Sequence, residues 1–443
     1  MSAQPTPPSP EDIESVAQQA VLSAEPGPAA KRQDSRPSIL FCCPGSVLDV
    51  TSGAALSLRS ILAALVAKGM RAVALQATIF DSPQGGEHVM KAGESQKDKP
   101  VWRTVIHGVE HLIVKTSVPQ RRFMTCQEEE TYITLFRAEI QKRRPDMVFL
   151  WGGLVLERTV MREARDAGIP VVFYLVNPGY KDKTVFKDVS VVITDTQATA
   201  DLYKQRHGLD CIPVGKFINP AEVKSKAPRQ PKFITFINPS FEKGVSVFMP
   251  LARLAARECP EVKFLVVQSR GRWATALKVL KFKPEDFPNV TVIGHQRDMR
   301  PIYASTRALL LPSLWHESGA RVIAEAHING VPVLASDTGG SPELVGQGGL
   351  IFQLPEAVRE KRGEVVVDEP TLRPWLAAIR RIWHEPDYYA GLCRAVEAEA
   401  VQHDMSHNAD RFIAAVAPWV VPSLQAAKAP SGAGAPAGAP PRP

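Results

Sequence analysis

The sequence has no long apolar run and no secretory signal, and each lack excludes a class of protein. No stretch of about 18 uncharged apolar residues occurs, so we expect no membrane-spanning helix. The N-terminus, MSAQPTPPSPEDIESVAQQA, carries acids and prolines where a secretory signal has a basic region and an apolar core. We therefore expect a cytoplasmic protein.

Patterns typical of metal sites and disulfide frameworks are also missing. The six cysteines are scattered, with no CxxC pair, which argues against a zinc site and against a set of disulfides. The adjacent Cys42 and Cys43 end an apolar run and are interpreted as buried structural residues. No DxD dyad is placed for Mg²⁺, and no His, Cys and Asp cluster has the spacing of metal ligands. The sequence thus predicts no bound metal.

The charge is basic, but it lacks the pattern of a nucleic-acid binder. The chain has 53 Lys and Arg against 46 Asp and Glu, a net charge of +7. Such a surface attracts anionic lipid or nucleotide phosphates as well as other polyanions. Basic clusters such as Lys142-Arg143-Arg144 are not combined with regularly spaced aromatic residues, and no nucleic-acid-binding motif occurs. We therefore expect no nucleic-acid partner, whereas peripheral contact with an anionic membrane stays open, including at the inner face of the cell membrane.

The remaining composition is that of a globular protein with biased ends. The 443 residues are 44% hydrophobic and 22% charged, which suits two or three folded domains. Residues 1–36 are rich in Pro, Ser, Ala and Gln, and residues 422–443 form a Pro, Gly and Ala tail. Neither end can bury much apolar surface, so we expect both to be disordered.

Between these ends, short apolar runs alternate with helical patterns. Runs such as SILFCC and RAVALQA lack polar alternation, which is typical of strands buried on both faces of a parallel sheet. The pattern fills residues 37–215, is interrupted by a polar, Pro-rich linker at 216–231, and restarts over 232–385. Helices are expected over 386–421, with the option of packing back on the first domain. The fold class is thus α/β, with two Rossmann-like doubly wound domains facing a cleft. Ligands of such sheets bind at the carboxyl ends of the strands.

Residues 307–345 carry the most informative pattern. A strand is followed by a loop with Glu317, and Ser318-Gly319-Ala320 then opens a helix that contains Glu325. Glu325 lies roughly 8–10 Å deeper than the helix start, which suits two parts of one ligand better than a pair of carboxylates on one bond. Gly319 allows close backbone approach, and the free amides of a helix N-terminus favour an anion. The segment therefore predicts a diphosphate at the amides, with one acid toward each side of it.

This segment resembles the donor-site signature of retaining GT-B glycosyltransferases of family 4. Their pattern is PS-x(2-3)-E-(S/G)-x-G-x(4)-E-A-x(3)-G-x-PV-x-AS-x(2)-GG-x(2)-E. The matching residues are Pro312-Ser313, Glu317, Glu325-Ala326, Gly330, Pro332-Val333, Ala335-Ser336, Gly339-Gly340 and Glu343. In ESGAR the glycine comes one residue earlier than is common in the family. The resemblance covers residues 233–350 and, more weakly, the N-terminal half. It implies an acceptor domain at 37–215 and a donor domain at 232–385.

The resemblance also implies a role for individual residues. The acid at Glu325 would bind the ribose hydroxyls of a nucleotide sugar, and Glu317 would contact hydroxyls of the donor sugar. The amides of Gly319 and Ala320 would hold the diphosphate, and Lys243, in a strand-loop-KG motif, would pair with a phosphate. Glu317 and Lys243 are the candidate catalytic residues. The other candidate donor-binding positions are Ser318, Gly339, Gly340, Gly294 near the base, and Gly53 in the loop across the cleft.

The sequence departs from the family pattern at two places. The family usually has an arginine near the position of Asn238, and Arg270 or Arg272 in the QSRGRW loop is a candidate replacement. Many relatives also have a histidine after a strand of the N-terminal domain, where this chain has Asn177. The N-domain group that assists the reaction is therefore not identified.

The implied reaction is transfer of a sugar, with retention of configuration, from a nucleotide diphosphate sugar to an unidentified acceptor hydroxyl. UDP is the default nucleotide by family habit, and no metal or other cofactor is expected. Two alternatives stay open. One is another GT-B enzyme that uses the same donor, such as an epimerase, and the other is a catalytically degenerate module that binds nucleotide sugars.

Overall fold

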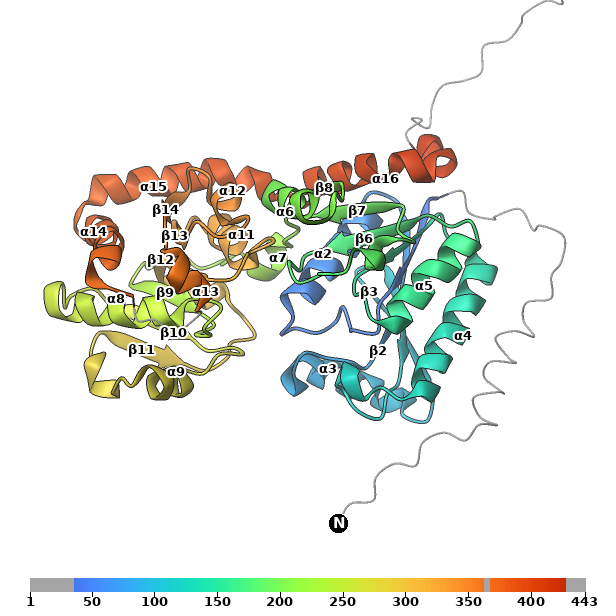
Figure 1. The fold of residues 1–443 in the computed structure, drawn as a ribbon, viewed down its shortest axis with the longest axis horizontal. Coiled ribbons are helices and arrows are strands. Elements are labelled where there is room, and N and C mark those ends of the chain that lie inside the picture. The colour runs from blue at the N-terminus through green and yellow to red at the C-terminus, as the bar shows by residue number, and fades with distance from the viewer. Residues whose placement is uncertain (1–35, 362–366, 428–443) are drawn as a thin grey trace, which may run out of the picture.

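The computed structural model describes residues 36–361 and 367–427, which form two α/β domains side by side (Figure 1). The disorder expected for residues 1–35 and 428–443 concerns segments outside the described residues. The last helix, α16 (Met405–Ala427), continues past residue 421, where the sequence analysis ended the helices. Its backbone leaves helical geometry at Val420, two residues before Pro422, close to the end of the helices expected from the sequence.

The N-terminal domain is built on an eight-stranded sheet with the order β3-β4-β2-β1-β5-β6-β7-β8. Only β3 runs antiparallel within it, as a hairpin with β4. The strands are β1 (Ser38–Cys42), β2 (Arg71–Ala77), β3 (Val101–Ile106), β4 (Val109–Val114), β5 (Met147–Leu150), β6 (Val171–Leu175), β7 (Val191–Thr194) and β8 (Cys211–Pro213). The buried apolar runs seen in the sequence form its centre, with every residue of β1, β5, β6 and β7 buried.

Helices cover both faces of this sheet (Figure 1). They are α2 (Gly53–Ala67), α3 (Pro83–Gly93), α4 (Cys126–Arg143), α5 (Val155–Asp166) and α6 (Gln197–His207), with 3₁₀ turns η1 (Glu94–Gln96), η2 (Arg121–Phe123) and η3 (Lys183–Phe186). The short helix α7 (Pro220–Val223) lies in the stretch expected to be the linker, and the Asn219 side chain caps it.

The C-terminal domain has a six-stranded parallel sheet with the order β11-β10-β9-β12-β13-β14. Its strands are β9 (Phe233–Ile237), β10 (Phe264–Val267), β11 (Val290–Ile293), β12 (Thr306–Leu311), β13 (Val333–Ser336) and β14 (Gly349–Phe352). In chain order this is the 3-2-1-4-5-6 arrangement of a doubly wound sheet, in which the order reverses between β9 and β12. Ligands bind such sheets outside the carboxyl ends of the strands at that reversal.

The remaining helices complete the C-terminal domain and return to the first one. They are α8 (Val245–Glu258), α9 (Trp273–Leu280), α10 (Arg300–Ser305), α11 (Arg321–Ile328), α12 (Ser341–Val345), α13 (Glu356–Glu360), α14 (Glu369–His384) and α15 (Pro386–Glu399), with 3₁₀ turns η4 (Pro284–Asp286) and η5 (Ala400–His403). Helices α15 and α16 run along one side of the molecule, and α16 contacts α2 and β7 of the N-terminal domain (Figure 1).

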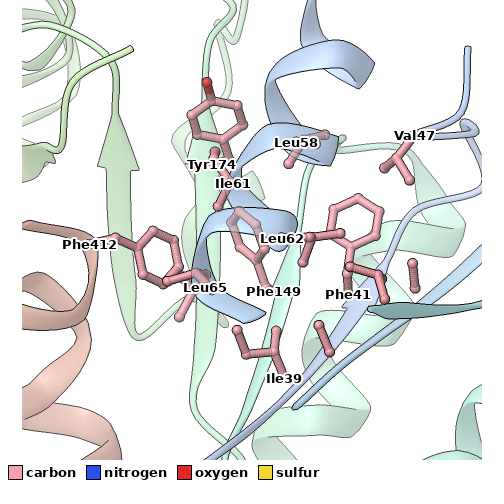
Figure 2. Packing of buried hydrophobic residues seen from close by; sticks show 14 of the residues in the cluster. Ile39, Phe41, Val47, Leu58, Ile61, Leu62, Leu65, Phe149, Tyr174 and Phe412 are labelled. Carbon is pink, nitrogen blue, oxygen red and sulfur yellow. The ribbon is translucent and has the colours of Figure 1, made fainter. Parts of the chain in front are cut away.

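The core of the N-terminal domain includes α16. Phe41 of β1, Phe149 of β5 and residues of α2 pack together, and Phe412 of α16 joins them (Figure 2). The rings of Phe149 and Phe412 meet edge to face with centroids 5.4 Å apart. The C-terminal helix thus connects the two domains through buried apolar contact, which is the strongest driving force available to hold it there.

Both sheets have the Rossmann-like doubly wound form, which confirms the fold class expected from the sequence. Among the described residues, no helix has the length and apolar character needed to cross a membrane.

Candidate active site

Lys243 and Glu317 meet at the reversal of strand order in the C-terminal sheet. Lys243 lies in the loop after β9, and Glu317 lies in the loop after β12. Lys243 Nζ donates to Glu317 Oε1 at 2.6 Å, and the Ser313 hydroxyl donates to the same oxygen at 2.5 Å. Glu317 Oε2 takes part in neither bond. A buried carboxylate and a partly exposed ammonium are therefore held together at the edge where ligands of this fold bind.

Glycines bring these loops into contact. Gly244, next to Lys243, has φ +81°, and a Cβ there would lie 1.8 Å from the Pro312 carbonyl oxygen. Gly339 has φ +57°, and a Cβ there would lie 2.5 Å from the Glu317 carbonyl oxygen. The amide of Gly340 donates to that same oxygen at 2.7 Å. Gly339 thus fits against the backbone of Glu317, where a side chain has no room, and the Gly340 amide holds the Glu317 carbonyl.

Glu325 lies about one turn into α11, because this helix begins at Arg321 and not at Ser318 as the sequence predicted. Tyr303 donates its hydroxyl to Glu325 Oε2 at 2.8 Å, and Arg321 Nε donates to Oε1 at 3.2 Å. Burial, and then the charge of Glu325, raise the pKa of the Tyr303 phenol well above its usual value. Both oxygens of Glu325 are fixed, yet a carboxylate has about four lone-pair positions and keeps acceptor capacity for a hydroxyl.

The N-terminal domain lies directly against the loop that holds Glu317. A Cβ at Gly319 would lie 2.2 Å from Asp195 Oδ2, which follows β7. Lys216 Nζ donates to Asp195 Oδ2 at 2.7 Å, and Tyr174 donates to Oδ1 at 2.6 Å. Burial raises the pKa of Asp195 and lowers that of Lys216, although the two are bonded to each other. No role was predicted for this pair from the sequence. Its signal was the polar run Thr194-Asp195-Thr196 at the end of a buried strand.

Further polar contacts join the two domains beside this pair. Thr196 Oγ1 donates to the Ser318 carbonyl at 2.9 Å, so Ser318 meets the N-terminal domain through its backbone. Glu343 of α12 accepts from the amides of Gln197 at 3.1 Å and Ala198 at 3.3 Å. A carboxylate of the C-terminal domain therefore caps α6 of the N-terminal domain. Its negative charge is stabilised by the positive end of the helix dipole.

Arg321, the first residue of α11, also reaches across to the N-terminal domain. Its Nη1 lies 3.4 Å from the Phe217 carbonyl oxygen and 3.5 Å from Ser57 Oγ of α2. A Cβ at Gly53, where α2 begins, would lie 3.8 Å from Arg321 Cδ. Gly53 is thus opposite the start of α11. The sequence analysis did not single out Arg321, although a cation four residues before Glu325 was visible in ESGARVIAE.

The two arginines predicted as a second cation lie in the loop between β10 and α9. Asn238 adopts φ +64°, and its Oδ1 accepts from the Gly271 amide at 2.7 Å, so its side chain fixes the loop after β10. Arg270 is 62% exposed, and its Nη1 is 3.8 Å from Asp81 Oδ2 of the N-terminal domain. Arg272 is exposed at the start of α9. In the described part of the chain, neither arginine is hydrogen-bonded to Glu317 or Glu325.

Gly294 and Ala320 are two further positions predicted to bind the donor. Gly294 follows β11 and is exposed, and a Cβ there would meet nothing within 4 Å. Ala320 is buried and precedes α11, where its carbonyl accepts from the Ile323 amide. The backbone around Gly319 and Ala320 therefore lies between Glu317, Glu325 and the N-terminal domain.

A cavity of about 300 Å³ adjoins the interdomain contacts. It is lined by Asp195, Gln197, Pro213, Gly215, Lys216, Glu343, Leu344, Gln402 and Arg411. Within residues 36–361 and 367–427, no three His, Cys, Asp or Glu side chains come together as a metal site.

A family model identifies the domain that carries this site. Residues 231–368 match the model of the family Glycosyl transferases group 1. Over these residues, about a third of the chain, the C-terminal domain is similar to the domain of that family. The match includes Lys243, Glu317, Glu325 and the two glycines at 339 and 340. A sequence comparison with curated proteins gives no match for this chain.

Solved structures extend the likeness to both domains. Sucrose-phosphate synthase from Thermosynechococcus elongatus has a TM-score of 0.63 and 16% identity, over 89% of this chain and 100% of the other. HepE of Anabaena, solved with UDP and glucose, has a TM-score of 0.58 and 15% identity, over 86% of this chain and 99% of the other. Trehalose 6-phosphate synthase from Burkholderia multivorans has a TM-score of 0.55 and 13% identity, over 89% of this chain and 100% of the other. At these identities the likeness establishes the GT-B fold.

Proposed function

We propose that the protein is a glycosyltransferase that moves a sugar, with retention of configuration, from a nucleotide diphosphate sugar to an acceptor hydroxyl. The nucleotide is UDP by default. The observation that carries the proposal is the Lys243–Glu317 contact at the strand reversal of a domain similar to that of glycosyl transferases group 1, with Glu325 on the helix that follows. A cation for phosphate and two acids for hydroxyls are the groups that a nucleotide sugar requires.

The chemistry follows from where charge develops. When the sugar leaves, negative charge builds on the diphosphate and positive character builds on the sugar ring. Lys243 and the backbone amides at the start of α11 would stabilise the departing diphosphate electrostatically. Glu317 would hold the sugar through its hydroxyls while its Oε1 keeps Lys243 in place. Glu325 would bind the ribose. The reaction then requires no metal or other cofactor.

The acceptor is proposed to enter from the N-terminal domain. The carboxyl ends of β1 and β5, where the strand order of that sheet reverses, are the expected binding edge there. At the surface of the same domain, Arg122 lies over the ring of Phe123, which is 54% exposed. A basic and an apolar side chain together suit contact with an anionic membrane, as for a cytoplasmic enzyme that works on a lipid-linked acceptor.

The proposal is tested by release of nucleoside diphosphate from UDP-, GDP-, ADP- and TDP-sugars, with and without a mixture of acceptors. We expect one nucleotide class to be consumed, faster with acceptor, and the anomeric configuration of the product to match that of the donor. Lys243→Ala should lower the rate about 100-fold, the effect typical of removing one stabilising donor. Lys278→Ala, on the exposed surface of α9, is the matched control and should leave the rate unchanged.

Other outcomes would identify the alternatives. Turnover of the donor without any acceptor, giving an altered free sugar, would indicate an epimerase-like enzyme. Binding of a donor with no turnover under any acceptor would indicate a degenerate binding module. Equal rates for Lys243→Ala and the unsubstituted protein would contradict the assigned site.

A further inference from the structure

The diphosphate site proposed above has one assigned cation, Lys243, and that cation is already engaged. Its ammonium contacts Glu317 at 2.6 Å. A nucleotide diphosphate brings about two negative charges, so a second cation is expected nearby. Asn238 cannot supply it, and the structure commits its side chain to the Gly271 amide. Arg270 is directed to Asp81 at the surface.

Arg321 is the cation that the fold places between the two candidate acids and the N-terminal domain. It begins α11, so its backbone belongs to the helix start where the diphosphate amides are expected. Its side chain is 10% exposed, and Glu325 lies one helical turn further along α11. On the other side it faces Gly53 and Ser57, at the beginning of α2.

The contacts of Arg321 leave it able to bind an anion. Nε and Nη2 are both directed to Glu325 Oε1, at 3.2 Å each, which fixes the guanidinium plane. Nη1 is directed to the N-terminal domain, where its two contacts, at 3.4 and 3.5 Å, are long for hydrogen bonds. A guanidinium has five N–H donors, and its planar fork matches phosphate oxygens.

Arg321 is paired with Glu325, and the other acid nearby, Asp195, is hydrogen-bonded to different partners. Asp195, the buried carboxylate of the N-terminal wall, is bonded through Oδ2 to Lys216 and through Oδ1 to Tyr174. The beginnings of α2 and α11 meet beside Arg321, and the positive ends of helices favour an anion. A Cβ at Gly53 would be at van der Waals distance, 3.8 Å, from Arg321 Cδ, which shows how close the arginine stem lies to the start of α2.

We propose that Arg321 is the second phosphate-binding cation of this site and contacts the diphosphate through Nη1 when the donor is bound. The proposal rests on the proposed function and deepens it. Arg321, in place of Arg270 or Arg272, would then supply the second positive charge. It would also connect the ribose-binding Glu325 to the phosphate-binding groups at the domain junction.

Calorimetric titration of the full chain with nucleoside diphosphates, and with the corresponding nucleosides, tests this. UDP, GDP, ADP and TDP are titrated first to find the base that binds. Arg321→Gln keeps a donor for Glu325 and removes the charge, and Arg321→Ala removes both. We expect Arg321→Gln to weaken the nucleoside diphosphate about 10- to 100-fold and the nucleoside less than about 3-fold. Lys278→Ala, which removes a positive charge from the exposed surface of α9, is the control and should change neither.

The opposite results are distinguishable. If Arg321→Gln weakens nucleoside and diphosphate equally, Arg321 only orients Glu325, and the proposal is overturned. Unchanged or tighter diphosphate binding in both variants would likewise overturn it, and would instead identify a side chain that obstructs the site. If the unsubstituted protein binds no nucleoside diphosphate, the proposed function fails with it, a result recognised before any variant is made. Far-ultraviolet circular dichroism of each variant confirms that it is folded.

Discussion

At the scale of single residues, the site depends on glycines as much as on charged side chains. Gly339 holds the backbone of Glu317 because its φ of +57° and the close Glu317 carbonyl exclude a Cβ. Gly319 does the same toward Asp195 across the domain boundary. A change at either position is therefore felt at the candidate catalytic acid without altering any charge.

Gly339→Ala tests this dependence. Gly168→Ala is a matched control, because Gly168 also has a positive φ, +70°, but a Cβ there would meet nothing within 4 Å. We expect the control to cost about 1–2 kcal/mol of unfolding free energy from backbone strain alone. Gly339→Ala should cost more and also abolish donor binding. Chemical denaturation of both variants measures the difference, and equal costs would show that the contact with Glu317 can relax.

Whether a site residue could be predicted from the sequence depends on how far apart in the chain its partners lie. Lys243, Glu317 and Glu325 could be predicted because strand order and a local pattern place them on one sheet edge. Asp195 and Lys216 could not, because they are 21 positions apart and no local pattern pairs them. Arg321 could not, because its contacts with Ser57 and Phe217 cross to the other domain. The predicted roles of Arg270 and Arg272 came from their position in a loop, and Asn238 holds that loop to the loop after β9 through the Gly271 amide.

At the scale of elements, the apolar runs predict the buried strands directly, whereas no pattern in the sequence predicts helix α3. Its sequence, PQGGEHVMKAG, has glycines in its interior, which weaken a helix in isolation. Gly85 lies against Asp49, and Gly86 lies against Phe80, both too close for any side chain. Tertiary packing therefore forms this helix, and such packing is invisible to propensity.

The contact between α11 and η5 makes a prediction about pH. His327 and His403 are buried, and His403 Nε2 lies 3.3 Å from His327 Nδ1. Burial lowers the pKa of His327 to about 4 and that of His403 to about 3. Unfolding would return both toward about 6.5, so the unfolded chain binds more protons between these values. Stability contributed by the neutral pair is complete above about pH 6.5 and is lost as the pH falls toward 4.

His403→Gln removes one of these titrations. We expect the loss of unfolding free energy between pH 7.5 and pH 5 to be smaller in this variant than in the unsubstituted protein, by about 1–2 kcal/mol. Urea denaturation at the two pH values measures it. An identical pH dependence in the two proteins would mean that this pair does not control acid stability. His107→Gln, at an exposed position, is the matched control.

At the scale of the whole molecule, contacts across the two domains close the region around the site. Glu343 caps α6, Arg270 pairs with Asp81, and Arg297 is bonded to Glu87 of α3. Helix α16 adds apolar contact with the first domain. The alternation of apolar runs and helical patterns predicts two doubly wound domains. The contacts between the domains could not be predicted, because they pair residues that are far apart in the sequence.

Glu343→Ala is predicted to loosen this arrangement. Asp368→Ala is the matched control, because Asp368 caps α14 within one domain through the Thr371 amide. Each should cost about 1 kcal/mol, the usual value of a lost cap. Only Glu343→Ala should increase the radius of gyration in small-angle X-ray scattering, since only that cap joins two domains. An unchanged radius would show that the other contacts suffice to keep the domains together.

The most direct test of the central claim, a nucleotide-sugar site formed by Lys243, Glu317 and Glu325, is thermal unfolding in the presence of UDP-, GDP-, ADP- and TDP-sugars. At about 100 times its dissociation constant, a bound donor stabilises the folded chain by roughly 2.7 kcal/mol. We predict a rise in melting temperature with one nucleotide class, which is lost in Glu325→Gln and kept in Glu285→Gln, an exposed control in the same domain. No rise with any donor, or a rise that persists in Glu325→Gln, would contradict the account.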